Sequence, residues 1–193
     1  MTAYDDMMNE QLYDVNDATL VTEREHARDL YDELNQTSFH DKAKLKRLVT
    51  ELFGSVGDNA EVRPRFICDY GYNIHVGDNF FANFDCILLD TCPITIGDNC
   101  LLAPRVQLYT AAHPLDVTDR TSWLGVGKAI TIGNNCWIGG NSTILPGVTL
   151  GDNVVVGGGS VVTKSFGSNV AIAGNPARVI KTLAPKKIGR AHV

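Results

Sequence analysis

Aliphatic residues recur at every sixth position along the C-terminal half of the chain. The unbroken run is Ile132, Ile138, Ile144, Leu150, Val156 and Val162, and Ile96, Leu102 and Leu108 share its phase. Neither an α-helix nor a meandering sheet has this period. A hexapeptide repeat is typical of a parallel β-helix, in which short strands alternate with tight turns. The pattern therefore predicts a mainly β protein built from stacked coils.

The positions two residues before the aliphatic ones fit the interior of such a coil. Residues i and i−2 of a strand point to the same face, and these positions hold mostly small or apolar residues such as Cys86, Cys100 and Cys136. The turns read Gly-Asp-Asn or Gly-Asn-Asn, for example at 97–99 and 133–135. Gly and Asn adopt positive φ at low cost, which a repeated sharp corner requires.

The repeat is interrupted twice. Leu88 and Ile96 are eight residues apart, so we expect a small bulge directed outward around Asp90, Thr91 and Cys92. A second gap, from Leu108 to Ile132, predicts a loop excluded from the coil over residues 112–129. Long structureless loops in compact domains are usually functional.

The first part of the chain lacks the repeat and predicts helices. A capping-box sequence at 22–25 predicts a helix from there to about residue 35. A second amphipathic helix should run from about 40 to 53, and an irregular polar segment should lie between 10 and 19. The predicted organisation is a helical segment at 1–55, a β-helix with its excluded loop and a C-terminal turn at 56–183, and a flexible tail at 184–193.

Composition and charge argue against several classes of partner and site. The net charge of −5 gives no reason to expect a nucleic acid or an anionic membrane as partner. No apolar run approaches the ~20 residues of a membrane span, and the acidic N-terminus lacks a secretory signal, so a cytoplasmic protein is expected. Five cysteines without a CxxC pair favour reduced thiols in the core over a metal or redox site.

The interior of a β-helix is packed, so a functional site must lie on its outside. His113 stands at the start of the excluded loop, and an imidazole there could take a proton from a hydroxyl near neutral pH. Lys164, Arg178 and Lys181 follow the last coils and together could hold an anionic ligand, although simple solvation explains any one of them. The sequence contains no cluster of candidate histidines, so no metal site is predicted.

Polar acceptors on the early coils are candidates for binding sugar hydroxyls. They are Asp69, Asn83 and Asp90. The capping of a turn explains Asp90 almost as well.

Four segments resemble the galactoside and maltose acetyltransferases of the hexapeptide-repeat family. The segments are 68–74 (CDYGYNI), 79–85 (NFFANFD), 110–114 (TAAHP) and 174–180 (GNPARVI). The resemblance implies a left-handed parallel β-helix assembled as a homotrimer, with active sites between neighbouring subunits. It also implies acetyl-CoA as co-substrate and no metal.

The resemblance further implies roles for single residues. His113 matches the family's catalytic histidine, Asn83 an asparagine that positions the acceptor and stabilises the transition state, and Asp69 an acceptor contact that favours a glucosyl-type sugar. The positions that match coenzyme contacts are Gly140, Gly158, Thr163, Lys164, Arg178 and Trp137, with Lys181 in place of a family arginine. Two acceptor-binding aspartates of the galactoside enzymes are replaced here by Thr91 and Val15, and Asp14 or Asp17 could substitute for the second.

We therefore predict an O-acetyltransferase that moves acetyl directly from acetyl-CoA to a hydroxyl of a glucose- or maltose-type sugar, with His113 as general base. No acetyl-enzyme is expected, because no Cys or Ser is paired with a base. The alternatives are an enzyme for another galactoside- or glucoside-type acceptor and a non-catalytic scaffold. A β-helix carbonic anhydrase would need three zinc-binding histidines that the sequence lacks.

Overall fold

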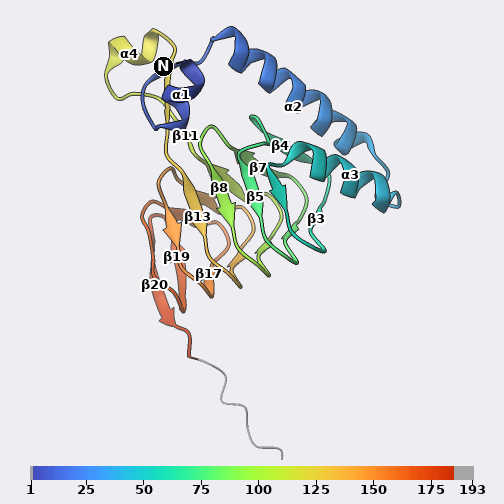
Figure 1. Ribbon diagram of the computed structural model, residues 1–193. Coiled ribbons are helices and arrows are strands. Elements are labelled where there is room, and N and C mark those ends of the chain that lie inside the picture. Colours follow the sequence, from blue (N-terminus) through green and yellow to red (C-terminus); the bar gives the residue numbers. More distant parts are fainter. Residues whose placement is uncertain (1, 185–193) are drawn as a thin grey trace, which may run out of the picture.

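The protein is a left-handed parallel β-helix with helices packed against its first coils (Figure 1). The computed structural model describes residues 2–184. Three sheets form the faces of a prism, and successive strands move from one face to the next. The predicted mainly β fold is confirmed. The predicted tail at 184–193 lies, apart from its first residue, outside the described residues.

Each face of the prism is one sheet of short strands. The first face contains β4 (Phe66–Cys68), β7 (Cys86–Leu89), β10 (Gln107–Tyr109), β15 (Thr143–Ile144) and β18 (Val161–Val162). The second contains β2 (Ser55–Val56), β5 (Ile74–Val76), β8 (Ile94–Ile96), β13 (Ile130–Ile132) and β16 (Thr149–Leu150). The third contains β3 (Glu61–Val62), β6 (Phe81–Ala82), β9 (Leu101–Leu102), β14 (Trp137–Ile138), β17 (Val154–Val156), β19 (Val170–Gly174) and β20 (Ala177–Thr182).

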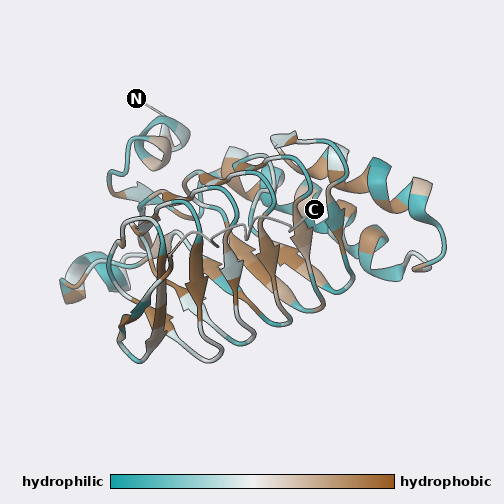
Figure 2. Ribbon diagram, turned by 90° about the horizontal axis from the view of Figure 1, so that it is seen from below, coloured by the Kyte–Doolittle hydropathy of each residue, from teal (hydrophilic) through white to brown (hydrophobic). Residues whose placement is uncertain are grey.

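The six-residue spacing determines the register of the sheets. Ile132 pairs with Ile96 of the preceding coil and with Leu150 of the next, and all three side chains are buried. Figure 2 shows hydrophobic residues gathered on the strands and hydrophilic ones at the turns. All five cysteines are buried and free, as the composition predicted. Burial of these aliphatic rows is the main source of stability for the prism.

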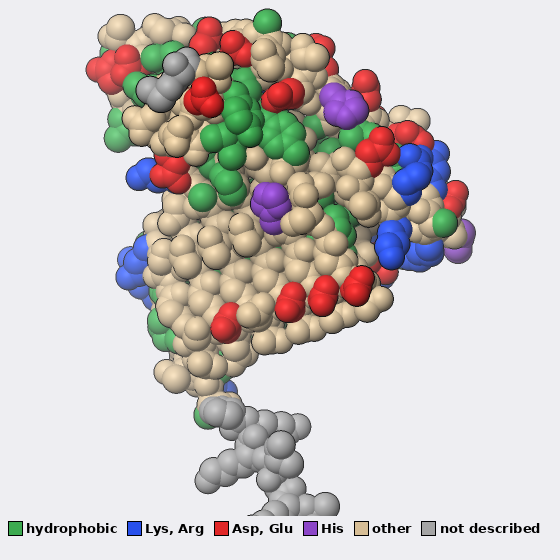
Figure 3. All heavy atoms as spheres, viewed as in Figure 1, with side chains coloured by type: hydrophobic (Ala, Val, Ile, Leu, Met, Phe, Trp, Pro, Cys, Tyr) green, Lys and Arg blue, Asp and Glu red, His purple; other side chains and the backbone are tan. Residues whose placement is uncertain are grey.

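The corner between the second and third faces is built from stacked polar side chains. Asn79 and Asn99 adopt φ values of 55° and 56°, and the Asn79 amide donates to Asn99 Oδ1 over 2.9 Å. The Asp98 carboxylate accepts the backbone N–H of Asp78 one coil below, at 2.8 Å. A Cβ atom at Gly77 would lie 2.2 Å from that carboxylate, so the corner requires glycine. Figure 3 shows a row of acidic side chains along one edge of the prism.

The helices at the N-terminal end cover the first coils. They are α1 (Ala3–Met8), α2 (Ala18–Gln36) and α3 (Lys42–Leu52), and α2 and α3 contact β4 and β3 respectively. The predicted start of α2 at Thr22 is wrong. The Thr22 hydroxyl donates to the Ala18 carbonyl inside the helix, and Asp17 is the N-cap, accepting the N–H groups of residues 19 and 20.

The Asn35 side chain of α2 pairs with a strand of the first coil. Its Nδ2 donates to the Phe66 carbonyl over 2.8 Å, and its Oδ1 accepts the Phe66 N–H over 2.7 Å. An amide with both a donor and an acceptor can match a backbone position in this way. Asn35 therefore occupies the place that a preceding strand would take beside β4.

The excluded segment carries secondary structure that the repeat did not predict. Residues 112–129 contain the end of β11 (Ala111–Ala112), α4 (Val117–Thr121) and β12 (Leu124–Gly127). β12 lies between β11 and β1 (Tyr13–Asp14) in an antiparallel sheet. Both predictions of irregular chain, at 112–129 and at 10–19, are therefore wrong for these strands. The partners β1 and β12 are more than 100 residues apart in the chain, and local spacing cannot indicate such a pairing.

Within residues 2–184, none of the helices is both long enough and apolar enough to cross a membrane.

Candidate active site

A cavity of about 360 Å³ lies between the first face of the prism, the excluded segment and the N-terminal segment. It is lined by Tyr13, Val15, Asn16, Arg24, Asp69, Tyr70, Leu89, Thr91, Ala111, Ala112, His113, Trp123 and Gly125. Two residues that the sequence singled out, His113 and Asp69, thus share one cavity. The volume is in the range of small-ligand sites.

His113 is exposed in this cavity and its ring is oriented by the excluded segment. The Nδ1 atom lies 3.1 Å from the Leu124 carbonyl oxygen in β12. A carbonyl oxygen only accepts hydrogen bonds, so we assign the hydrogen of the neutral ring to Nδ1. This tautomer leaves a lone pair on Nε2, and a neutral imidazole nitrogen with a lone pair can accept a proton.

Asp69 stands at the end of β4 and its carboxyl group is largely withdrawn from solvent. Burial raises the pKa of this carboxyl, while the charge of Arg24 and a hydrogen bond from Thr91 oppose the rise. The Thr91 hydroxyl lies 3.4 Å from Asp69 Oδ2. Arg24 is itself fixed, because it donates to the Tyr70 hydroxyl over 2.7 Å and to the Val15 carbonyl over 2.6 Å.

Asp90 supports this part of the cavity from below. Its Oδ1 accepts the N–H groups of Asp69 and Tyr70, each at 2.9 Å, and its Oδ2 accepts that of Asn73 at 3.2 Å. The side chain is fully buried, and burial raises its pKa to about 7. Of the two interpretations of Asp90, the structure supports turn capping.

The predicted outward bulge at 90–92 is wrong. All three side chains are buried, because Asp90 bonds to the turn after β4 and the Cys92 N–H donates to the Thr110 hydroxyl over 2.9 Å.

Asp17 does not line the cavity, although its neighbours Val15 and Asn16 do. Its Oδ1 accepts the N–H groups of Thr19 and Leu20 at the start of α2. Asp14 is similarly engaged, accepting the N–H of Asn16 over 2.8 Å. A role for Asp17 in acceptor binding stays a prediction.

The remaining predicted residues lie at two other places on the prism. Asn83, Gly140 and Gly158 occupy the corner that precedes the strands of the first face, whereas His113 and Asp69 follow strands of that face. A Cβ atom at Gly158 would lie 3.2 Å from the Gly140 carbonyl oxygen, so these glycines are stacked on neighbouring coils. The Asn83 Oδ1 accepts the Phe84 N–H over 2.9 Å. One chain therefore places Asn83 and His113 at opposite edges of the same sheet.

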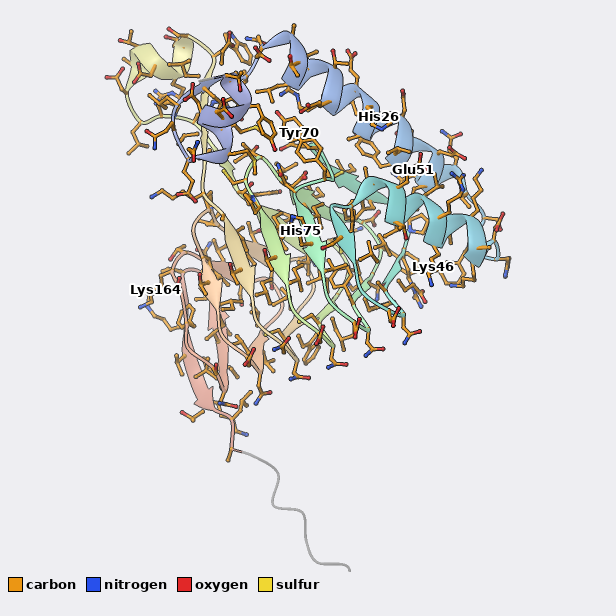
Figure 4. The ribbon with its side chains drawn as sticks, viewed as in Figure 1. His26, Lys46, Glu51, Tyr70, His75 and Lys164 are labelled. Atoms are coloured by element: carbon orange, nitrogen blue, oxygen red, sulfur yellow. The ribbon has the colours of Figure 1, made fainter. Side chains whose placement is uncertain are left out.

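The predicted coenzyme contacts gather on the later coils. Trp137, Ala171 and Lys181 share one row across the third face, through successive pairings of β14, β17, β19 and β20. The Trp137 side chain is 52% exposed, and Arg178 on β20 is exposed as well. Thr163 and Lys164 follow β18 at the edge of the first face. Figure 4 shows Lys164 projecting from these late coils, well away from Lys46 on α3.

Sequence reasoning missed several residues that line the cavity, including Tyr13, Arg24 and Trp123. Arg24 stood in the supposed capping box and was therefore assigned to a helix start. Trp123 lay in a segment that was predicted to be irregular. Their positions depend on the pairing of β1 with β12 and on the packing of α2.

No metal-binding group is apparent in the part of the chain that the structure describes. Within residues 2–184, no three His, Cys, Asp or Glu side chains are placed to hold an ion together.

Comparisons with known proteins agree with the fold and with the sequence motifs. Family models match residues 129–164 (hexapeptide repeat of succinyl-transferase) and residues 6–57 (maltose acetyltransferase hexapeptide capping motif). A galactoside O-acetyltransferase of Escherichia coli (strain K12) is 44% identical over 164 residues, which is 85% of this chain and 81% of that protein.

Two solved structures are similar over almost the whole chain. A maltose O-acetyltransferase from Clostridium difficile 630 is 50% identical, covers 96% of this chain and 99% of its own, and superposes with a TM-score of 0.95. A galactoside acetyltransferase in complex with coenzyme A is 40% identical, with coverage of 95% and 92% and a TM-score of 0.92. The chain belongs to the maltose and galactoside O-acetyltransferase group of the hexapeptide-repeat acetyltransferases.

Proposed function

We propose that the protein transfers an acetyl group from acetyl-CoA to a hydroxyl of a glucose- or maltose-type sugar. The observation that carries the proposal is that His113, whose Nε2 keeps a lone pair in the assigned tautomer, lines the same small-molecule cavity as Asp69. The similarity to an acetyltransferase with bound coenzyme A supports the donor. The similarity to a maltose enzyme supports the type of acceptor.

His113 acts as the general base in this proposal. Its Nε2 accepts the hydroxyl proton of the acceptor as the sugar oxygen attacks the thioester carbonyl, and the Leu124 carbonyl stabilises the resulting imidazolium. The departing thiolate then takes the proton from the ring, so the products are an acetylated sugar and free coenzyme A. We expect direct transfer, because none of the described residues that line the cavity is a cysteine or a serine that a base could activate. Such proton transfer accelerates reactions by about 10²–10⁴-fold.

Asp69 is the residue we assign to acceptor binding within this cavity. A carboxyl group accepts hydrogen bonds through its oxygens, so it suits a sugar hydroxyl that donates. Thr91 and Arg24 hold the carboxylate and its neighbourhood in place.

The donor site requires a second copy of the chain. Asn83, which we expect to stabilise the transition state, lies across the first face from His113 in the same chain. A neighbouring subunit that presents this edge to the cavity would bring Asn83 to His113, together with Gly140 and Gly158. Trp137 and Arg178 would contact the coenzyme on the third face, with Lys181 beside them, and Thr163 and Lys164 would do so at the edge of the first.

We therefore expect a closed homotrimer in solution. A closed ring brings one edge of each subunit against a different edge of the next, which is a heterologous contact. Light scattering should give three times the chain mass of 21.0 kDa. A mass of one chain at working concentration, together with acetyl transfer, would contradict the shared site.

A thiol-release assay tests the function directly. With acetyl-CoA present, maltose and glucose should release free coenzyme A faster than water alone, and thiogalactosides should be poorer acceptors because Asp69 and Thr91 replace the galactoside pattern. A non-catalytic scaffold would show no release with any sugar. Release with galactosides alone would reassign the acceptor.

The same assay tests the donor residues. The double variant Lys164→Ala, Arg178→Ala should raise KM for acetyl-CoA roughly tenfold or more, since even one charge-assisted contact of about 1.5 kcal/mol corresponds to a factor of about ten. KM for the sugar should stay nearly constant. The matched control is Lys46→Ala, Arg47→Ala on α3, which removes two exposed charges at the other end of the prism. If the control raises KM equally, the effect is one of net charge.

A further inference from the structure

We propose that the indole ring of Trp123 is the platform on which the pyranose ring of the acceptor stacks. The inference deepens the proposed function and rests on it for the identity of the ligand. It assigns recognition of the sugar's apolar face to one side chain, in addition to the hydroxyl contact assigned to Asp69.

Trp123 is the most exposed of the aromatic residues that line the cavity. Three aromatic residues line it, and Tyr13 and Tyr70 are only 6% and 3% exposed. Trp123 is 66% exposed. Ligand pockets are lined predominantly by apolar and aromatic groups with a few polar ones, and here Trp123 is the large apolar group that a ligand could cover.

The backbone of Trp123 makes tryptophan an unexpected residue at this position. It directly follows Ser122, the C-cap of α4, and has φ of 60°. The left-handed conformation after a helix is usually taken by glycine, because a Cβ atom is unfavourable there. A bulky ring that remains exposed gains little burial to offset this cost. Conformational outliers of this kind gather at ligand sites.

The same segment holds both Trp123 and the catalytic base. The Trp123 carbonyl accepts the Val15 N–H over 3.3 Å, and the following residue, Leu124, provides the carbonyl that orients His113. Gly125 packs closely on β1 and on the residue after it, because a Cβ atom there would lie 2.8 Å from the Tyr13 ring and 2.7 Å from Val15. The backbone that carries the indole ring is therefore held in place relative to His113 before a ligand binds, which lowers the entropic cost of binding.

A pyranose ring suits this arrangement. Its hydroxyls project around the rim, while the C–H groups of each face form a small apolar surface. With Asp69 bonded to a hydroxyl, an aromatic plane on another wall of the cavity can cover one of these faces. Trp123 then selects for a cyclic sugar and orients the hydroxyl that His113 deprotonates.

The first test is the variant Trp123→Gly. Glycine suits the observed φ, so the melting temperature should be unchanged or higher. KM for maltose should rise at least tenfold, with KM for acetyl-CoA and the mass in solution unchanged. Trp123→Phe, which keeps an aromatic face, should recover most of the affinity. An unchanged KM for maltose would overturn the proposal, and so would a loss of the trimer mass, which would make Trp123 an interface residue.

The second test is independent of turnover. The chain has two tryptophans, so Trp137→Phe leaves Trp123 as the sole indole fluorophore. Maltose should change its emission in the presence of coenzyme A, whereas the Trp123→Gly protein should respond to coenzyme A and not to maltose. A response to maltose in this variant, with no acetyl transfer to maltose by the unsubstituted protein, would refute the proposed function but keep the stacking site. Acetyl transfer to maltose by the unsubstituted protein, without a fluorescence response in the variant, would refute the stacking site alone.

Discussion

Replacement of His113 with alanine is expected to lower kcat by at least ~10²-fold. The reason is that the variant loses the imidazole that we propose as the general base, while the backbone of β11 and β12 keeps its pairing. The dissociation constant of acetyl-CoA should change little, because only the proton transfer is removed. Steady-state kinetics together with calorimetric titration of coenzyme A would measure both.

The matched control for this variant is His26→Ala, an exposed histidine on α2 (Figure 4). It should leave kcat near its normal value. Near-normal turnover in the His113 variant would exclude its role as base. A large rise in the coenzyme dissociation constant instead would place His113 in the donor site.

Replacement of Asp90 with alanine should lower the free energy of unfolding by about 3 kcal/mol or more, since each buried donor left unpaired costs about 1–3 kcal/mol. Three backbone N–H groups, those of Asp69, Tyr70 and Asn73, would lose their partner at once. Chemical denaturation monitored by circular dichroism would give the change in free energy.

The matched control is Asp98→Ala. Asp98 also accepts a backbone N–H, that of Asp78 at 2.8 Å, but at an exposed corner where water can replace it. Its loss should cost only about 0.5–1.5 kcal/mol. Equal losses in the two variants would show that burial of the Asp90 network is not what makes it stabilising.

The prism could be predicted from sequence because every coil repeats one local rule. The spacing of Ile96, Ile132 and Leu150 determines which strands pair, and the Asn residues of the corners determine where the chain turns. His113 could be found because it stands where this rule is interrupted, and Asp69 because it is a polar residue on an early coil, in a segment that resembles the family. The two residues line one cavity because the strands that they follow stack in register on the same face.

The rest of the site could not be predicted because it depends on contacts between distant segments. Arg24 reaches the Tyr70 hydroxyl from a helix 46 residues earlier in the chain. The pairing of Tyr13 with Gly125 depends on the shape of both segments and not on any local period. Asp90 was ambiguous for a related reason, since a carboxylate that caps a turn and one that binds a sugar have the same sequence signal.

The Asn35 amide beside Phe66 covers the free edge of β4, the first strand of the first face. The first strand of a stacked sheet exposes backbone groups that another chain could pair with, which is a route to uncontrolled polymerisation. Asn35 already satisfies the donor and the acceptor of Phe66, and α2 covers that edge. At the other end, the chain folds back as the antiparallel strand β20 against β19. Repeat proteins need such terminal caps for solubility, so the helical segment that precedes the hexapeptide repeat also limits growth of the sheet from one molecule to the next.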